Sequence, residues 1–98
     1  VFVKLDELDW IEAADNYVQL HAGPNVYLHR ETLTALVEKL PGNKFLRISR
    51  STVVNVDRIK ELQPLPHGDY GVVLSDRTRL TLSRSYRDAL QQFMGKLP

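Results

Sequence analysis

Apolar and polar residues alternate along most of this chain, with the two-residue period of half-buried β-strands. The clearest alternation lies in residues 45–55, FLRISRSTVVN, where Phe45 and Leu46 should face opposite sides of a sheet. The stretch continues into the apolar pair Val53 and Val54 and ends at Asn55, which should help to turn the chain. We therefore expect one core strand here, with arginine and serine side chains displayed at its end.

The first third of the chain predicts an antiparallel sheet. Asp15 and Asn16 form a turn signal between two alternating segments, so residues 8–13 and 17–21 should pair as a hairpin. Short strands are also expected at residues 2–5 and, after a turn at residues 23–25, at residues 26–29. These strands follow one another without an intervening helix, which argues against a parallel βαβ arrangement.

The hydrophobic period changes at residues 33–40, where apolar residues recur three and four positions apart, as on one face of a short helix. Thr32 is placed to cap this helix, and Pro41 and Gly42 should end it. A second helix is expected near the C-terminus, with Ser83 as its cap and an apolar stripe formed by Tyr86, Ala89, Leu90, Phe93, Met94 and Leu97.

Strand patterns return between the two helices. Pro64 and Pro66 mark residues 59–65 as an edge strand or as the end of one. After a turn at residues 67–69, residues 70–74 and 79–82 should form another hairpin. The chain as a whole therefore predicts a mainly β domain with two short helices.

A length of 98 residues suits a single domain, covering residues 1–98. The absence of cysteine excludes disulfides and thiolate metal sites, and it permits a cytoplasmic location. No apolar run approaches the roughly 18 residues that span a bilayer, so we expect no membrane contact. Because the chain opens at Val1 without an initiator methionine, we expect it to be the excised C-terminal part of a longer protein.

Charge is unevenly distributed along the chain, although the net charge is only +1. Most of the charged residues in the first fifteen positions are acidic, whereas most of those in residues 39–60 and 77–87 are lysine and arginine. Two basic clusters in an otherwise neutral domain suggest an anionic partner on one face. The alternative is a solvated surface on which the charges happen to cluster.

The residues that could serve catalysis or metal binding do not form a recognisable site. His21, His29 and His67 lie on different predicted elements without the spacing of metal ligands, and the first two are candidate partners across neighbouring strands. The serines have no histidine nearby in the sequence, and no glycine-rich phosphate loop is present. A phosphoester-processing enzyme would need a carboxylate or metal site among the arginines, and the sequence shows none. We therefore expect a non-enzymatic protein without a cofactor or metal.

Two pairs of arginines carry the strongest functional signal. Arg47 and Arg50 lie three residues apart at the end of the predicted core strand, and Arg84 and Arg87 lie three apart at the start of the last helix. A guanidinium group presents a rigid fork of donors that suits phosphate oxygens or a guanine edge. The helix start adds backbone N–H groups that favour phosphate.

Two of these arginines have a structural alternative. Arg47 could instead hold a carboxylate such as Glu12 or Asp57, and Arg87 could pair with Asp88. Arg50 and Arg84 are therefore the first candidates for contacts with bases or phosphates.

Four segments carry a family resemblance. They are LDWIEA followed by DNYV in residues 8–18, the helix of residues 33–40 that ends in LP, FLRISRS with VVN in residues 45–55, and LSRSYR in residues 82–87. Together they resemble the LytTR (LytR/AlgR-type) DNA-binding domain of bacterial response regulators. The resemblance implies antiparallel, layered β-sheets whose edge loops read successive major grooves of DNA.

Carried over by position, the reading loops are residues 15–17, the corner at residues 49–51 and the junction at residues 83–84. Family members often have a basic residue or histidine in the first loop, but Asn16 could still pair with an adenine edge. The usual glycine of the last hairpin turn is replaced here by residues 76–78, which would add positive charge near the DNA-facing side. The candidate DNA-binding residues are Asn16, Tyr17, Lys44, Arg47, Ser49, Arg50, Ser51, Arg84 and Arg87.

The resemblance also implies a function in transcription. We expect sequence-specific binding of double-stranded DNA by the cytoplasmic output domain of a bacterial response regulator in a two-component system. The expected partners are promoter DNA, an upstream receiver domain in the full-length protein, and a second copy paired on repeated half-sites. The alternative is a β-rich protein–protein interaction module without DNA binding, which would use the acidic first strands or the apolar C-terminal helix.

Overall fold

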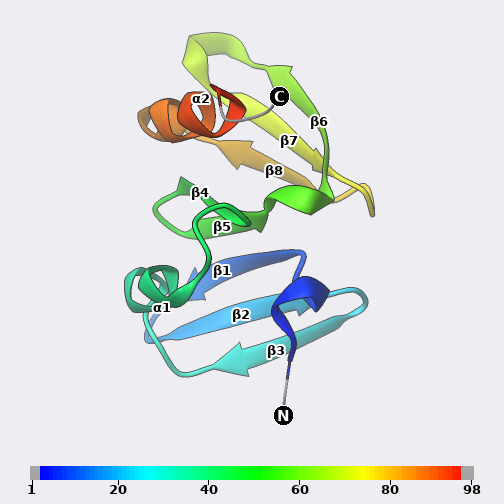
Figure 1. Cartoon of the computed structure of the whole chain (residues 1–98), viewed down its shortest axis with the longest axis vertical. Coiled ribbons are helices and arrows are strands. Elements are labelled where there is room, and N and C mark those ends of the chain that lie inside the picture. The colour runs from blue at the N-terminus through cyan, green and yellow to red at the C-terminus, as the bar shows by residue number, and fades with distance from the viewer. Residues whose placement is uncertain (1–2, 96–98) are drawn as a thin grey trace.

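Eight strands in two antiparallel sheets form the framework of the computed structural model, which describes residues 3–95 (Figure 1). The larger sheet has the strand order β3-β2-β1-β5-β4, and the smaller sheet has the order β6-β7-β8. The strands are β1 (Trp10–Ala14), β2 (Tyr17–Ala22), β3 (Asn25–His29), β4 (Phe45–Ser49), β5 (Thr52–Asn55), β6 (Ile59–Pro64), β7 (Tyr70–Leu74) and β8 (Arg79–Leu82). The helices are α1 (Leu33–Lys39) and α2 (Arg87–Gly95). The mainly β prediction with two short helices is confirmed.

Most local predictions hold. The β1–β2 and β7–β8 hairpins form as expected, and β6 lies at the edge of the smaller sheet, as its prolines predicted. Thr32 caps α1, because its Oγ1 accepts a hydrogen bond from the Ala35 N–H at 3.2 Å. No helix within residues 3–95 is long and apolar enough to cross a membrane. Leu97, the last member of the predicted α2 stripe, lies outside the described residues.

The predicted opening strand at residues 2–5 is wrong in the part that the structure describes, and Phe2 lies outside it. Leu5–Glu7 forms a 3-10 turn instead, in which the Glu7 N–H donates to Lys4 O at 3.0 Å and the Leu8 N–H to Leu5 O at 3.1 Å. These local bonds use backbone groups that a strand would offer to a neighbour. A four-residue alternation is too short to distinguish the two outcomes.

The predicted single core strand at residues 45–55 is also wrong, because the chain reverses in its middle. β4 and β5 pair antiparallel, with Phe45 opposite Asn55 and an irregularity between Arg47 and Ser49. The turn at residues 50–51 contains no glycine, proline or asparagine, so the usual turn signal is missing. The Ser49 side chain supplies it, since its Oγ accepts a hydrogen bond from the Ser51 N–H at 3.2 Å.

The β4–β5 hairpin separates two hydrophobic cores. Phe45 and Val53 belong to the core that α1 helps to cover, together with Ile11 and Val18 of the larger sheet. On the opposite face, a second core contains Leu46, Ile48, Val54, Val72, Leu74, Leu82 and Leu90, from the hairpin, the smaller sheet and α2. Phe45 and Leu46 therefore face opposite sides, as the alternation predicted.

Asn55 ends the hairpin in a buried position, with only 3% of its surface exposed. Its Nδ2 donates to the Leu8 carbonyl oxygen at 2.8 Å, and its Oδ1 accepts the Asp57 N–H at 3.0 Å. The side chain thereby starts the 3-10 turn Val56–Arg58 and ties it to the segment before β1. The predicted structural role of Asn55 in turning the chain is confirmed.

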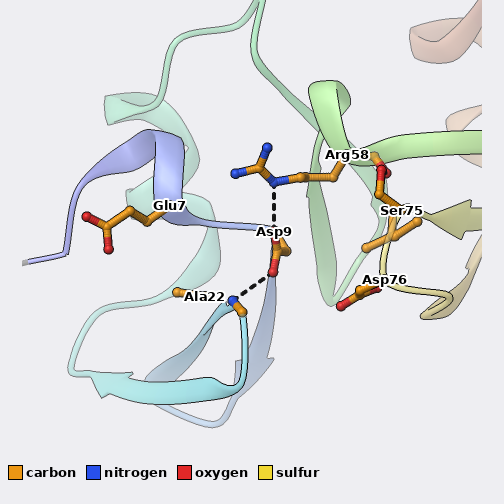
Figure 2. A pocket seen from close by; sticks show the side chains of 8 residues that line it. Glu7, Asp9, Ala22, Arg58, Ser75 and Asp76 are labelled. Carbon is orange, nitrogen blue, oxygen red and sulfur yellow. Dashed lines mark hydrogen bonds and ion pairs between the residues drawn. The ribbon is translucent and has the colours of Figure 1, made fainter.

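An ion pair connects the two sheets beside this turn (Figure 2). The Arg58 Nε donates to Asp9 Oδ1 at 2.8 Å, and the Gly23 N–H donates to Asp9 Oδ2 at 2.8 Å. Asp9 precedes β1 of the larger sheet, and Arg58 precedes β6 of the smaller one. The pair therefore helps to set how the two sheets are placed relative to each other.

The predicted pairing of His21 with His29 across neighbouring strands is wrong. The β2–β3 register places His21 opposite Val26 and His29 opposite Val18. On its other side His21 lies opposite Trp10, and the two rings stack at 3.8 Å between centroids with an interplanar angle of 6°. The alternation of β2 and β3 fixed the faces of their residues but not this register.

Candidate nucleic-acid interface

The three loops singled out in the sequence lie at the same end of their strands, along the left side of Figure 1. The first follows β1, the second joins β4 to β5, and the third joins β8 to α2. The Ala13 N–H donates to Ser51 O at 2.8 Å, which links β1, shortly before the first loop, to the second loop. The Ser83 N–H donates to Ile48 O at 2.9 Å, which links the third loop to β4. We call this end the loop end of the domain.

The first loop presents Asn16 and Tyr17 to solvent. Asp15 adopts φ +59°, the left-handed conformation that tight hairpin turns require and that aspartate tolerates better than most residues. Asn16 is exposed at the tip, and Tyr17 begins β2 with 42% of its surface accessible. Both side chains are therefore available to a partner at the loop end.

The second loop is held by Arg47 from within. The Arg47 Nε donates to Ser49 O at 3.2 Å, and its Nη2 donates to Arg50 O at 2.5 Å. Its Nη1 reaches Thr34 Oγ1 of α1 at 3.4 Å. The predicted alternative in which Arg47 holds Glu12 or Asp57 is wrong, because its partners are backbone carbonyl oxygens and a hydroxyl group.

Arg50 and Ser51 form the tip of this second loop, and both are exposed. Ser49 is half-buried, and its hydroxyl lies 3.4 Å from that of Ser51. Ser49 therefore serves the turn itself, whereas Ser51 and Arg50 are placed toward solvent. Because Arg47 braces this turn, the backbone that carries the Arg50 guanidinium has a well-defined position.

The third loop places Ser83 and Arg84 before α2. The prediction that the Ser83 side chain caps this helix is wrong: its Oγ lies 3.2 Å from Ser85 Oγ and accepts no backbone N–H of the first turn. Asp69 takes that role, since its Oδ1 accepts the Arg84 N–H at 2.9 Å. That N–H is therefore already occupied by a carboxylate and is not free for a phosphate.

Arg84 and Arg87 are both exposed at the loop end. A Cβ built on Gly68 would lie 3.4 Å from Arg84 Cβ and 3.4 Å from Arg87 Nη1, so the loop before β7 packs directly on both arginines. Within residues 3–95 neither arginine forms an ion pair, so the predicted alternative of an Arg87–Asp88 pair is wrong. Both guanidinium groups remain available to an anion.

Lys44 is the one candidate that the fold separates from the others. It precedes β4, whereas Ser49 ends that strand and Arg50 follows it, so Lys44 lies at the opposite end of the strand. Its carbonyl oxygen accepts the Val56 N–H at 2.9 Å, next to the turn that Asn55 starts. The structure thus brings together Asn16, Tyr17, Arg47, Ser49, Arg50, Ser51, Arg84 and Arg87.

Sequence reasoning missed two groups at the loop end. Arg30 follows β3 and is exposed, and the pairing of His29 with Val18 places it beside Tyr17. Pairing β2 with β3 outward from the turn at residues 23–24 would have placed Arg30 beside Tyr17. Asp69, which accepts the Arg84 N–H, could not have been found in this way, because no local pattern links it to Arg84.

Not every cation at this side of the domain is free. Lys39 Nζ lies 2.5 Å from Glu31 Oε2, and His29 Nε2 lies 2.9 Å from Glu31 Oε1. The hydrogen bond from Lys39, followed by that from His29, holds the pKa of Glu31 below its usual value. Lys39 is therefore already paired, in contrast to Arg84 and Arg87.

A hollow of about 610 Å³ lies at the other end of the domain, and Figure 2 shows it from close by. Its walls are formed by Glu7, Asp9, Ala22, Gly23, Arg58, Leu74, Ser75 and Asp76. Three carboxylates against one arginine do not favour a phosphate, and Arg58 is already bound to Asp9. Among residues 3–95, no three histidine, aspartate or glutamate side chains are grouped to hold a metal ion.

The turn between β7 and β8 borders this hollow and not the loop end. Ser75 and Asp76 line the hollow, and Arg77 follows them at the end of β8 that lies opposite to Ser83. The expectation that the replaced glycine adds positive charge near the DNA-facing side is therefore not supported by the placement of Arg77. Its charge lies a full strand away from Arg84.

Comparison with known proteins agrees with this arrangement. A family model described as the LytTr DNA-binding domain matches residues 1–95. The chain is 30% identical over 94 residues to the sensory transduction protein LytT of Bacillus subtilis and 32% identical over 97 residues to the positive alginate biosynthesis regulatory protein of Pseudomonas aeruginosa. The matches cover 96% and 97% of this chain, but only 39% of each relative.

The fold also matches a solved structure. A LytTr DNA-binding domain from Bacillus cereus superimposes with a TM-score of 0.90 at 26% sequence identity, covering 97% of this chain and 87% of that one. The order and pairing of the strands are therefore those of an established domain type.

Proposed function

This chain belongs to the LytTr DNA-binding domain family, and we propose that it binds duplex DNA through the loop end. DNA binding is the function of this domain type, and the alternative of a protein-interaction module without DNA binding has no support among the relatives. The observation that carries the proposed site is the meeting of three separate loops at one end, each with exposed polar or basic side chains.

The proposed roles follow from chemistry and position. Arg50 and Arg84 stand on braced backbone and are assigned to base edges, since arginine donates bidentately to the O6 and N7 of guanine. Asn16 has the paired donor and acceptor that suit adenine. Arg87, Arg30 and Ser51 are assigned to phosphates. With Arg87 and Arg30 each meeting a phosphate, the plot of log K against log salt concentration should have a slope of about −1.8.

The role in a longer protein is inferred from the relatives. Their names describe sensory transduction and regulation, and they are longer than this chain. We assign the domain to the output end of a cytoplasmic, non-enzymatic transcription regulator that carries an upstream receiver domain. Two copies on repeated half-sites would raise an affinity that is modest for a single small domain.

The experiment that tests this function is a selection of random duplex DNA by the 98-residue domain. The wild type is compared with Arg50→Ala and Arg84→Ala, and with Lys44→Ala as a matched control at the other end of β4. We expect the wild type and Lys44→Ala to enrich one short motif. Each of the other two variants should lose preference at a different position of that motif.

Two results would contradict the proposal in different ways. Equal enrichment by all four proteins would keep DNA binding but remove the base-reading role from Arg50 and Arg84. If a folded wild type enriched no sequence at low salt, the isolated domain would not be a sequence-specific reader.

A further inference from the structure

We propose that Asp69 is a positioning residue for DNA recognition, which acts by holding the backbone of Arg84. The inference rests on the proposed DNA-reading role of Arg84. Asp69 lies between β6 and β7, fifteen residues before Arg84, and its Oδ1 accepts the Arg84 N–H at 2.9 Å. A hydrogen bond to a charged acceptor is stronger than one between neutral groups.

Two consecutive backbone N–H groups of the β8–α2 junction are bonded to acceptors from two different sheets. The Ser83 N–H donates to Ile48 O in the larger sheet, and the next N–H, that of Arg84, donates to the loop of the smaller sheet. The origin of the Arg84 side chain is therefore fixed relative to both sheets. Because Ile48 belongs to β4, the same bonds relate Arg84 to the Arg50 turn that follows this strand.

The loop that carries Asp69 is itself well braced. The Asp69 carbonyl oxygen accepts the Leu65 N–H at 2.9 Å, which closes the loop. Gly68 adopts φ +88°, and a Cβ there would lie 3.4 Å from Arg84 Cβ. The loop backbone thus packs on the base of the Arg84 side chain while the next residue holds its N–H. This arrangement presents the carboxylate in one place before any ligand arrives.

The charge of Asp69 opposes DNA, although its geometry serves recognition. A carboxylate beside Arg84 and Arg87 weakens the attraction of that surface for phosphate. The two effects can be separated, because Asp69→Asn keeps an oxygen that accepts the Arg84 N–H but removes the charge. Asp69→Ala removes both the charge and the acceptor. Only the second change should reduce discrimination between DNA sequences.

The test uses the duplex that the wild-type domain selects from random DNA, together with a scrambled duplex of the same length. Discrimination is measured as the dissociation constant for the scrambled duplex divided by that for the selected duplex. This ratio is determined for the wild type, Asp69→Asn and Asp69→Ala. We expect Asp69→Ala to lower this ratio about tenfold, the effect of one misplaced base contact, and Asp69→Asn to lower it less than about twofold. Both variants should bind the scrambled duplex more tightly than the wild type does.

A double-mutant cycle shows whether Asp69 acts through Arg84. In an Arg84→Ala background, Asp69→Ala should cause no further loss of the ratio, since the positioned side chain is absent. An equal loss in both backgrounds, or an unchanged ratio in Asp69→Ala, would overturn the positioning role. If Arg84→Ala alone left the ratio unchanged, the reading role of Arg84 would fail first and the role of Asp69 with it.

A second variant covers the case in which Asp69→Ala does not fold. Asp69→Glu keeps the charge but displaces the carboxylate by one methylene group. We expect this variant to bind the scrambled duplex as tightly as the wild type does. The ratio should fall several-fold, less than in Asp69→Ala, because the acceptor is displaced and not removed. A wild-type ratio in Asp69→Glu would overturn the proposal.

Discussion

The Arg47 guanidinium donates a hydrogen bond to the backbone carbonyl oxygen of Arg50, so one arginine of the RISR segment holds the backbone of the other. A second bond from the same group reaches the carbonyl oxygen of the preceding residue, Ser49. Arg47 is half-buried and Arg50 is exposed. The two arginines therefore have different duties, although the sequence made both of them candidates for DNA contacts.

This difference predicts the behaviour of Arg47→Ala. Specific DNA affinity should fall about tenfold, because the Arg50 turn loses its brace. The slope of log K against log salt concentration should stay unchanged, since no phosphate contact is lost. Arg87→Ala serves as the control, and it should make the slope shallower by about 0.9. If Arg47→Ala changed the slope by the same amount, Arg47 would itself contact a phosphate.

Asn55 should be among the most sensitive polar positions for stability. Asn55→Ala leaves the Leu8 carbonyl oxygen and the Asp57 N–H without their partner, so we expect a loss of about 2–3 kcal/mol in the free energy of unfolding. Urea unfolding of this variant beside the exposed Asn43→Ala measures the difference. Asn43→Ala should lie within about 0.5 kcal/mol of the wild type. A similarly small effect for Asn55→Ala would contradict its structural role.

Arg77→Gly should stabilise the domain. Arg77 adopts φ +75°, a conformation that costs most residues about 1–2 kcal/mol and that glycine adopts freely. Glycine also gives the unfolded chain more conformational entropy, which offsets part of this relief. We therefore expect the free energy of unfolding to rise by about 0.5–1 kcal/mol. The melting temperature measures it, and Arg79→Gly in the extended strand β8 is the control that should lower stability. DNA affinity should not change, and a large loss would place Arg77 in the interface.

Asp76 should make folding sensitive to acid. The Thr78 N–H, 2.9 Å from Asp76 Oδ1, holds the pKa of this carboxyl below its ordinary value of 3.8. A depressed pKa in the folded state means that the ionised group stabilises the fold above this ordinary value, and that the contribution is lost as the pH falls through the folded pKa. The wild type should therefore melt at a higher temperature than Asp76→Asn near neutral pH.

The difference between these two proteins should close in acid, once Asp76 is protonated in both the folded and the unfolded state. Melting curves recorded over the acid range provide the measurement. A difference that persisted at the lowest pH would mean that the packing of the turn, and not the charge of Asp76, distinguishes the two proteins.

Local pattern accounts for most of the secondary structure. The Asp15 turn and the Thr32 cap depend on residues only a few positions apart, so the sequence determines them directly. The missed reversal at Arg50 shows the limit of this reasoning, because Ser49 provided a turn through its side chain and not through a glycine or proline. The basic clusters at residues 39–60 and 77–87 were also visible in the sequence.

The sequence by itself thus determined most of the strands, the two helices and the arginines of the proposed interface other than Arg30. The tertiary structure decided which of them meet: it braced Arg50 with Arg47, joined Arg84 to Asp69, and carried Lys44 to the opposite end of β4. The physical reason is that a two-residue period sets only the face on which each side chain lies. The order and direction of the strands, which bring distant loops together, arise from packing across the whole domain.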